Sequence, residues 1–520
     1  MAALKRLRTG ARIALAAALV FASGAAWAQT REASVTIHAD KPGPKVQREI
    51  FGQFAEHLGT GIYGGLWVGK NSRIPNSDGF RNDVIAALRA IKVPLIRWPG
   101  GCFADEYHWR EGVGAKRPVK VNTHWGGVTE PNAVGTNEFM NFSELVGAEA
   151  YVSGNVGSAP PQEMADWVEY MTSPTTSTLA NERRANGRKE PWKLPYLGLG
   201  NELWGCGGNM RPEYAADVTR RYATFVKAPA GTRIMKIASG ASDENYNWTE
   251  VMMREAGRQI DGIGVHYYTV GESWAHKGSA TGFDETSWAR VLSKTLKMDE
   301  YITKHSAVMD KYDPEKRVWL AVDEWGTWYD PEPGTNPGFL QQQNSLRDGL
   351  VAAINLNIFT HHAERVKMTN IAQMINVLQA MVLTDGAKMV LTPTYHVYHM
   401  YMPWQDATEL PVDLAGPRYD KDKFTMPALN SSAVRAADGT THVSLVNLDP
   451  NEPMTVTLKV DGSTATMLSG EVLTADQMDA HNSFDNPSSL KPRDIAQVPV
   501  TNGTVTLTLP AKSVTVVALR

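Results

Sequence analysis

Cysteine is scarce in this sequence of 520 residues, which contains only Cys102 and Cys206. Small proteins that depend on a disulfide framework are short and rich in cysteine, so the sequence does not belong to that class. The two thiols could still form one bridge, and the sequence leaves both states open. Zinc-type spacing of His and Cys is also missing. The close His pairs are His361/His362 and His396/His399, and adjacent residues such as the first pair cannot share one helix face. We therefore expect neither a metal nor another cofactor.

Several other features that would assign a function are absent. Beyond the N-terminus, no apolar run approaches the ~20 residues that a membrane-spanning helix needs. The 52 Lys and Arg nearly balance the 55 Asp and Glu, for a net charge of −3, and there is no basic tract. We therefore expect neither nucleic acid nor a membrane as a partner. The G-x-S-x-G motif of serine hydrolases and the phosphate-binding P-loop are missing too.

The N-terminus has the pattern of a secretory signal peptide. Four basic residues lie within the first 12 positions, and the apolar run Ile13–Ala22 follows them. Ala26-Trp27-Ala28 fits the small-x-small pattern of a cleavage site, which would make Gln29 the first residue of the mature chain. The pattern predicts export to the periplasm or the medium.

A repeated alternation of strand and helix patterns runs from about residue 50 to residue 373. Short apolar segments end in polar or glycine residues and are followed by amphipathic segments, such as 83–91, 161–171, 212–226 and 344–361. Such alternation indicates parallel βαβ units, and eight units predict a (β/α)8 TIM barrel of the α/β class. An open doubly wound sheet is the alternative, but its G-x-G-x-x-G motif is missing. The eight expected strands end in FAEH (54–57), LIRWPGG (95–101), YVSGNVGS (151–158), LGLGNE (197–202), IMKIASG (234–240), IGVHYY (263–268), VWLAVDEW (318–325) and MTNIAQ (368–373).

The pattern changes after about residue 400. HVSLVNL (442–448), MTVTLKV (454–460) and TVTLTLP (504–510) alternate apolar and polar residues between turn sequences. This is typical of an antiparallel β-sandwich, and ASVTIHA (33–39) is expected to add an N-terminal strand to it. The expected organisation is a signal peptide (1–28), an N-terminal strand (29–44), a barrel (45–400) and a C-terminal sandwich (401–520).

Polar residues at the carboxyl ends of the expected strands are the candidates for function, because active sites of such barrels lie there. Carboxylates, amides, a tyrosine and aromatic residues dominate this set, which suits the hydrolysis of glycosidic bonds. That reaction needs one protonated carboxyl group and one ionised carboxylate. The set comprises Glu56, His57, Arg97, Cys102, Asn201, Glu202, His266, Tyr268, Asp323, Glu324 and Gln373.

Two short motifs narrow the class. GNELWG (200–205) and DEWG (323–326) resemble the motifs at strands four and seven of the retaining glycosidases built on (β/α)8 barrels. The longer stretches 50–69, 96–114, 135–170 and 371–381 look like family 51 α-L-arabinofuranosidases. The resemblance covers about residues 45–400 in order. It implies an exo-acting enzyme on arabinose-containing oligosaccharides or polysaccharides, and a possible homo-oligomer.

The resemblance also implies roles for individual residues. It makes Glu202 the general acid/base and Glu324 the nucleophile. The first sugar subsite would be formed by Glu56, Cys102, Asn201, Tyr268 and Gln373. Glu202 must keep its proton, so we expect a raised pKa from an apolar wall and the nearby negative charge. Glu324 must stay ionised, and the hydroxyl of Tyr268 is a suitable donor.

Other residues at the barrel mouth have expected supporting roles. Arg97 is expected to anchor a carboxylate, with Glu56 as one candidate. His266 is expected to orient its neighbours, and Asp323 to point to the side of its strand opposite Glu324. A bridge between Cys102 and Cys206 would remove the thiol that could contact the sugar. The rim is expected to include Trp274, Trp325 and Trp328.

Two alternatives remain open at this point. The same two carboxylates could act on another sugar, as in a β-xylosidase or an endoglucanase. A non-catalytic carbohydrate-binding protein, in which the sandwich binds the ligand, is the alternative from a different class.

Overall fold

Eight parallel strands close into a barrel in residues 31–520, the part of the chain that the computed structural model describes. Each strand pairs with the next one along the chain, and the eighth pairs with the first. This closure excludes the open doubly wound sheet and confirms the predicted barrel. The predicted signal peptide lies outside the described residues. The barrel strands are β2 (Gly52–Phe54), β5 (Leu95–Trp98), β8 (Glu149–Gly154), β9 (Tyr196–Leu199), β10 (Met235–Ser242), β11 (Gly262–Val270), β12 (Trp319–Trp328) and β13 (Val366–Ile371).

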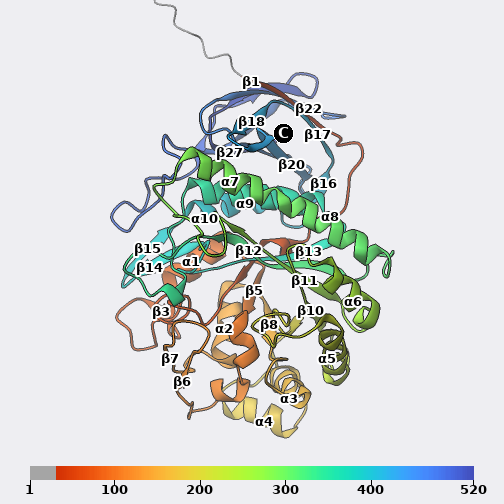
Figure 1. Cartoon of the computed structure of the whole chain (residues 1–520), viewed down its shortest axis with the longest axis vertical. Helices are drawn as coiled ribbons and strands as arrows, with labels where there is room; N and C mark the ends of the chain where they lie inside the picture. The colour runs from red at the N-terminus through yellow and green to blue at the C-terminus, as the bar shows by residue number, and fades with distance from the viewer. Residues whose placement is uncertain (1–30) are drawn as a thin grey trace, which may run out of the picture.

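Helices lie between the barrel strands and cover the outside of the barrel (Figure 1). Pro161 and Pro212 each stand in the first turn of a helix, where a missing N–H costs nothing. The helices are α1 (Asn82–Ala90), α2 (Thr136–Val146), α3 (Pro161–Thr172), α4 (Thr178–Ala185), α5 (Pro212–Phe225), α6 (Tyr246–Ala256), α7 (Glu285–Thr295), α8 (Lys297–Asp310), α9 (Leu346–His361) and α10 (Pro393–Met400).

One helix, α9, is buried around its whole circumference. Every residue from Leu346 to Thr360 is buried. The helix contacts β12 of the barrel on one side and the C-terminal strands β20 (Leu429–Arg435) and β21 (Thr441–Asn447) on the other. Figure 1 shows it between the barrel below and the C-terminal sheets above. A helix enclosed in this way is expected to be apolar on most faces, which explains its sequence.

The C-terminal region forms the predicted sandwich. One sheet runs β16 (Thr408–Leu410), β20, β21, β27 (Ser513–Leu519), β23 (Met467–Leu473) and β24 (Arg493–Asp494), with β25 (Val498–Pro499) paired to β23. The other runs β17 (Val412–Ala415), β1 (Arg31–Ile37), β22 (Met454–Val460) and β26 (Thr504–Leu509). The N-terminal strand β1 therefore joins the sandwich as predicted. It pairs in parallel with β22, so the sandwich contains one parallel pair. The boundaries at residues 44/45 and 400/401 stay a prediction.

Short elements complete the described chain. No helix within residues 31–520 is both long and apolar enough to cross a bilayer. Four two-stranded ribbons are formed by β3 (Asn76–Ser77) with β4 (Phe80–Arg81), β6 (Lys120–Val121) with β7 (Thr129–Glu130), β14 (Val382–Asp385) with β15 (Lys388–Leu391), and β18 (Arg418–Lys421) with β19 (Phe424–Pro427). The 3-10 turns are η1 (Arg48–Phe51), η2 (Cys102–Glu106), η3 (Trp109–Gly112), η4 (Pro337–Phe339) and η5 (Met402–Trp404).

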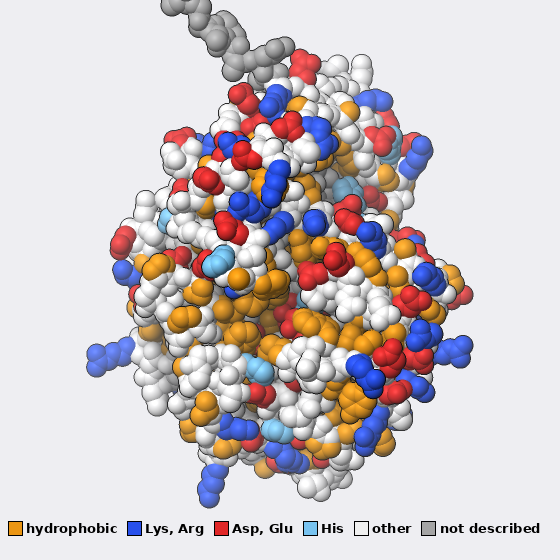
Figure 2. Space-filling model, in the orientation of Figure 1, with side chains coloured by type: hydrophobic (Ala, Val, Ile, Leu, Met, Phe, Trp, Pro, Cys, Tyr) orange, Lys and Arg blue, Asp and Glu red, His pale blue; other side chains and the backbone are white. Residues whose placement is uncertain are grey.

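The barrel interior is packed rather than hollow. A cluster of buried side chains from six strands fills it, and the polar residues at the strand ends lie beyond this layer. The cluster consists of Leu95, Tyr151, Tyr196, Ile237, Ala321 and Met368. Figure 2 shows a hollow near the centre of the view, with hydrophobic side chains around it and acidic side chains inside.

Candidate active site

Strand four ends in a sharp turn that presents Asn201 and Glu202. Gly200 has a φ of +80°, and a Cβ there would lie 2.8 Å from the Leu203 side chain, so glycine is required. Glu202 itself has a φ of +40°, an unusual conformation for a residue other than glycine. The backbone N–H of Leu203 donates to Ser239 Oγ at 3.2 Å, which fixes the turn from the next strand. Strained backbone of this kind is typical of functional sites.

Strand seven carries Asp323 and Glu324 in a distorted stretch. Where β12 pairs with β13, the register shifts between Val322 and Trp325. Where β12 pairs with β11, the register shifts between Gly264 and His266 of β11. This bulge breaks the simple alternation of faces. Both carboxylates consequently lie inside the barrel, so the prediction that Asp323 would face away from Glu324 was wrong.

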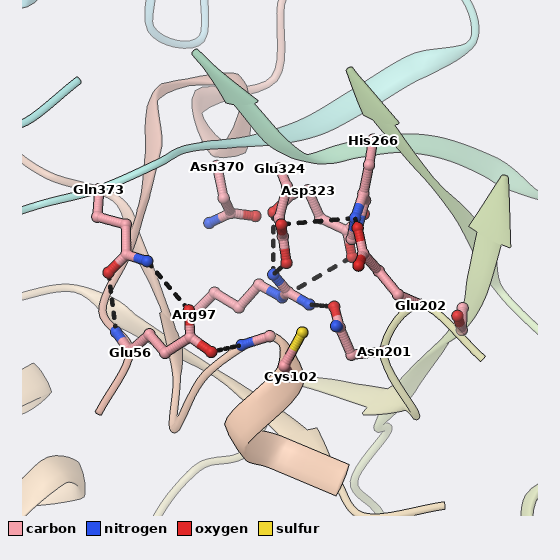
Figure 3. A network of polar contacts seen from close by, with 12 residues as sticks. Glu56, Arg97, Cys102, Asn201, Glu202, His266, Asp323, Glu324, Asn370 and Gln373 are labelled. Carbon is pink, nitrogen blue, oxygen red and sulfur yellow. Dashed lines mark hydrogen bonds and ion pairs between the residues drawn. The ribbon is translucent and has the colours of Figure 1, made fainter. Parts of the chain in front are cut away.

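Arg97, from β5, connects the two strand ends at the centre of the site (Figure 3). Its Nη1 donates to Glu324 Oε1 at 2.8 Å, and its Nη2 donates to Asn201 Oδ1 at 2.7 Å. Its Nε lies 3.9 Å from Asp323 Oδ2. Arg97 thus anchors carboxylates as expected, but its partners are Asp323 and Glu324 of strand seven, and Glu56 is not among them.

Glu202 and Glu324 approach each other closely. A ligand atom of each, together with one of His266, lies within 4.8 Å of the other two. His266 Nδ1 is 2.9 Å from Glu202 Oε1 and 3.5 Å from Glu324 Oε2, and Nε2 is 3.3 Å from Asp323 Oδ1. Glu324 Oε2 also accepts a hydrogen bond from the Tyr268 hydroxyl at 2.8 Å. At least one oxygen of Glu202 thus lies within 4.8 Å of an oxygen of Glu324, an approach that favours the short carboxyl separation of retaining glycosidases over the ~6.5–9.5 Å of inverting ones.

The electrostatics of the site differ between these groups. Burial raises the pKa of the Glu202 carboxyl; a hydrogen bond from His266 opposes this, and the charge of Glu324 adds to it. Burial by itself lowers the pKa of His266, but the carboxylates around it, with Glu324 foremost, raise it to about 10. A protonated carboxyl beside a hydrogen-bonded carboxylate is the combination that acid-assisted cleavage of a glycosidic bond requires.

Glu56 and Gln373 form a second polar pair at the same mouth. Gln373 Nε2 donates to Glu56 Oε2 at 3.1 Å, and the Glu56 backbone N–H donates to Gln373 Oε1 at 3.3 Å. Glu56 Oε1 accepts from the backbone N–H of Gly101 and Phe103 at 3.0 and 3.2 Å. Burial and the charge of Glu324 raise the pKa of Glu56 to about 7. The structure therefore brings Glu56, Asn201, Tyr268 and Gln373 together around the two central glutamates.

Cys102 does not offer a free thiol. It is bonded to Cys206 in a disulfide that joins the loop after β5 to the loop after β9. The expected thiol contact of Cys102 with a sugar is therefore absent in this form. Cys206 Sγ lies 3.6 Å from Glu202 Oε2, so the bridge borders the acid/base candidate.

The aromatic rim differs from the expectation at one position. Trp325 is fully buried and packs edge-on against Phe359, so it cannot line the mouth. Trp328 packs edge-on against both Tyr268 and Trp274. Trp274 is 55% exposed and is available at the rim.

Two supporting residues escaped the sequence reasoning. Trp125 Nε1 donates to Glu56 Oε1 at 3.0 Å. Asp105 is buried and accepts from the backbone N–H groups of Val156, Gly157 and Asn201 at 2.7–2.8 Å. It thereby ties three loops together below the acid/base turn. Asp105 lies in the short 3-10 turn η2 and Trp125 in a loop, so no strand or helix periodicity indicates where their side chains point. The one available signal was the place of Asp105 within the stretch 96–114.

Two sets of potential metal ligands share Glu202 at this mouth. One consists of Cys102, Glu202 and Cys206, and the other of Glu202, His266 and Glu324. In each set the ligand atoms lie within 4.8 Å of one another. The first set has its sulfur atoms engaged in the disulfide.

Comparisons with known proteins agree with this geometry. The family description Alpha-L-arabinofuranosidase 1 domain matches residues 87–286, and Alpha-L-arabinofuranosidase C-terminal domain matches residues 323–513. A protein of Bacteroides ovatus named intracellular exo-alpha-L-arabinofuranosidase is 50% identical over 513 residues, covering 98% of this chain and 100% of that protein.

Solved structures give the same result. The GH51 arabinofuranosidase from Xanthomonas axonopodis pv. citri is 60% identical, with a TM-score of 0.93 over 94% of this chain and 100% of that one. The arabinose complex of the α-L-arabinofuranosidase from Thermotoga maritima is 27% identical, with a TM-score of 0.83 over 94% and 99% of the two chains. Fold and site together define a glycoside hydrolase with a (β/α)8 barrel. The chain belongs to the α-L-arabinofuranosidases of glycoside hydrolase family 51.

The prediction of export is contradicted by these comparisons. The relative from Bacteroides ovatus carries the word intracellular in its name and matches 98% of this chain. The export prediction rested on a pattern of basic residues, about ten apolar residues and the small-x-small motif Ala26-Trp27-Ala28. We therefore withdraw it.

Proposed function

We propose that this enzyme is a retaining, exo-acting α-L-arabinofuranosidase that removes terminal arabinofuranosyl residues. The observation that carries the proposal is the close approach of Glu202 and Glu324, with oxygens within 4.8 Å of each other at the mouth of the barrel. An approach this close favours direct attack by the second carboxylate over activation of a water held between it and the sugar. The name of the relative from Bacteroides ovatus supports the exo mode.

In the proposed mechanism, Glu324 attacks the anomeric carbon while Glu202 protonates the leaving oxygen. Hydrogen bonds from Arg97 and Tyr268 keep Glu324 ionised and aimed at the sugar. The aglycone leaves and a covalent arabinosyl-enzyme remains. Glu202, now ionised, takes a proton from water, and this water releases arabinose with retained configuration.

The proposed sugar contacts surround this pair. Glu56 can accept from sugar hydroxyls, and Gln373 beside it can donate and accept. Asn201 is oriented by Arg97, and its amide nitrogen, which also donates to Cys206 Sγ at 3.8 Å, has a second N–H for a hydroxyl next to the anomeric centre. Tyr268 completes the set. Cys102 contributes through the cystine rather than through a thiol.

The proposed substrates are arabinose-containing hemicelluloses, pectic polysaccharides and their oligosaccharides. Initial rates on aryl α-L-arabinofuranoside, aryl β-xyloside and β-glucan test this, for the wild type and Glu324→Ala. We expect the arabinofuranoside to be the preferred substrate and the Glu324→Ala rate to collapse. Preference for the xyloside or the glucan would support the same-fold alternatives. Sugar binding without turnover would support a non-catalytic protein.

We also propose a homo-oligomer without nucleic-acid or membrane partners. The family resemblance supports the first part and the balanced charge supports the second. Light scattering of the purified chain tests the oligomeric state, and a monomer at all concentrations would contradict it.

A further inference from the structure

The disulfide places two sulfur atoms directly beside the acid/base candidate. Cys102 opens η2 after strand two of the barrel, and Cys206 lies in the turn after strand four, 104 residues later. Their Cα atoms are 5.5 Å apart. The bridge therefore crosses the mouth next to Glu202, and in the proposed hydrolysis its S–S bond is neither broken nor formed.

The two carboxylate oxygens of Glu202 face different neighbours, His266 and the disulfide. Its Oε1 is engaged by His266 Nδ1 at 2.9 Å, whereas its Oε2 faces Cys206 Sγ at 3.6 Å. One atom each of Cys102, Glu202 and Cys206 lies within 4.8 Å of the others, and all three residues are partly exposed. An ion arriving from solvent could thus reach two sulfurs and one oxygen at once.

We propose that reduction of the disulfide creates a binding site for a soft divalent cation, formed by Cys102, Cys206 and Glu202. A phosphine or dithiol reductant breaks the S–S bond and leaves two thiols. With a phosphine, phosphorus is oxidised to the phosphine oxide and water supplies the oxygen and both protons. The cation then replaces the two thiol protons, forms two metal–sulfur bonds and accepts Glu202 Oε2 as a third ligand.

Zn²⁺ and Cd²⁺ suit this set. Thiolates favour such cations, and three protein ligands with one open position are common for Zn²⁺. The site exists only in the reduced enzyme, because the sulfurs of a disulfide carry no thiolate charge. Metal binding at Oε2 would also stop hydrolysis, since Glu202 could no longer carry the proton. This inhibition rests on the proposed role of Glu202, whereas binding itself does not.

The test uses Cd²⁺ as the probe on the full-length enzyme. Oxidised enzyme and enzyme reduced with a phosphine, then freed of reductant, are titrated while the ultraviolet charge-transfer absorption of cadmium–thiolate bonds is recorded. We expect one Cd²⁺ per chain in the reduced enzyme, no such absorption in the oxidised enzyme, and recovery of metal-free enzyme with a chelator. Arabinofuranosidase activity, followed in parallel, should fall with the same saturation curve and return with the chelator.

Three variants separate the ligands. Glu202→Gln keeps both thiols and should bind Cd²⁺ at least about 10-fold more weakly. Cys206→Ser should lose the two-thiolate absorption. Cys102→Ser/Cys206→Ser, treated with reductant, should show the same activity with Cd²⁺ as it shows without Cd²⁺. Equal binding by oxidised and reduced enzyme, or undiminished inhibition of the double serine variant, would overturn the proposal and assign the cation to Glu202, His266 and Glu324 instead. Binding without inhibition would leave the metal site standing and contradict the role of Glu202.

Discussion

His266 Nδ1 lies 2.9 Å from Glu202 Oε1, so a group with a pKa raised to about 10 sits against the candidate acid. The hydrogen bond from His266 lowers the pKa of Glu202, whereas burial and Glu324 raise it. His266 therefore limits how far the pKa of the acid rises. The pH dependence of the activity should therefore depend on the opposing effects of His266 and Glu324 on the pKa of Glu202.

His266→Asn removes the positive charge and should raise the pKa of Glu202. The proton on Glu202 would persist to higher pH, so the basic limb of kcat/KM against pH should move up by about one unit. The rate at the optimum should fall because the carboxylates lose their common partner. His362→Asn, near the end of α9, should leave the limb in place. An unchanged or lowered basic limb in His266→Asn would contradict the assigned electrostatics.

Replacing Arg97 should weaken the fold as well as the activity. Arg97→Met leaves Glu324 and Asp323 buried without their cation, which typically costs about 3–5 kcal/mol. Denaturant unfolding at neutral pH measures the loss. Arg220→Met removes an exposed pair with Asp217 and should change the free energy of unfolding very little. Equal effects of the two substitutions would show that the buried pairs contribute nothing.

The stability of the enzyme should depend on the protonation of Glu56. Its pKa rises from the ordinary 4.5 to about 7, so the folded state binds this proton more readily than the unfolded state between those values. The free energy of unfolding should consequently fall as pH rises from 4.5 to 7, by at most about 3 kcal/mol from this group. In Glu56→Gln the fall should be smaller, because this carboxyl group no longer contributes. It should not vanish, because the pKa of Asp105 is also raised to about 7. A steeper fall in the variant would contradict the assignment.

Reduction of the disulfide should destabilise the enzyme. The bridge joins residues 104 positions apart, and a disulfide typically stabilises the folded state by roughly 2–4 kcal/mol through restriction of the unfolded chain. Thermal unfolding with and without reductant measures the difference. Cys102→Ser/Cys206→Ser should unfold at the same temperature under both conditions. A wild type insensitive to reductant, with the thiols shown to be free, would contradict the prediction.

Much of the fold could be predicted from the sequence because the barrel strands are apolar segments with polar ends. The positions of Asn201, Glu202, His266 and Glu324 followed from that pattern, since parallel strands all end at one face. The direction of Asp323 did not follow, because a bulge replaces the two-residue period of the strand.

The loops could not be predicted in the same way. Trp125 and Asp105 act from segments without regular periodicity, so nothing local indicated which groups they meet. The disulfide depends on the distance between residues 104 positions apart, which composition does not encode. Trp325 looked like a rim residue by its place beside Glu324, but the same strand directs it into the packing against α9.

The stereochemistry of azide rescue tests the proposed mechanism most directly. Glu202→Ala on an activated aryl arabinofuranoside should form the covalent intermediate, and azide should then attack it without needing a general base. Nuclear magnetic resonance of the arabinosyl azide should show the configuration of the substrate retained, with a large increase in turnover, while Glu324→Ala should give no retained product. Inverted product from Glu202→Ala, or near-normal turnover by Glu324→Ala without azide, would contradict the assignment of Glu202 as acid/base and Glu324 as nucleophile.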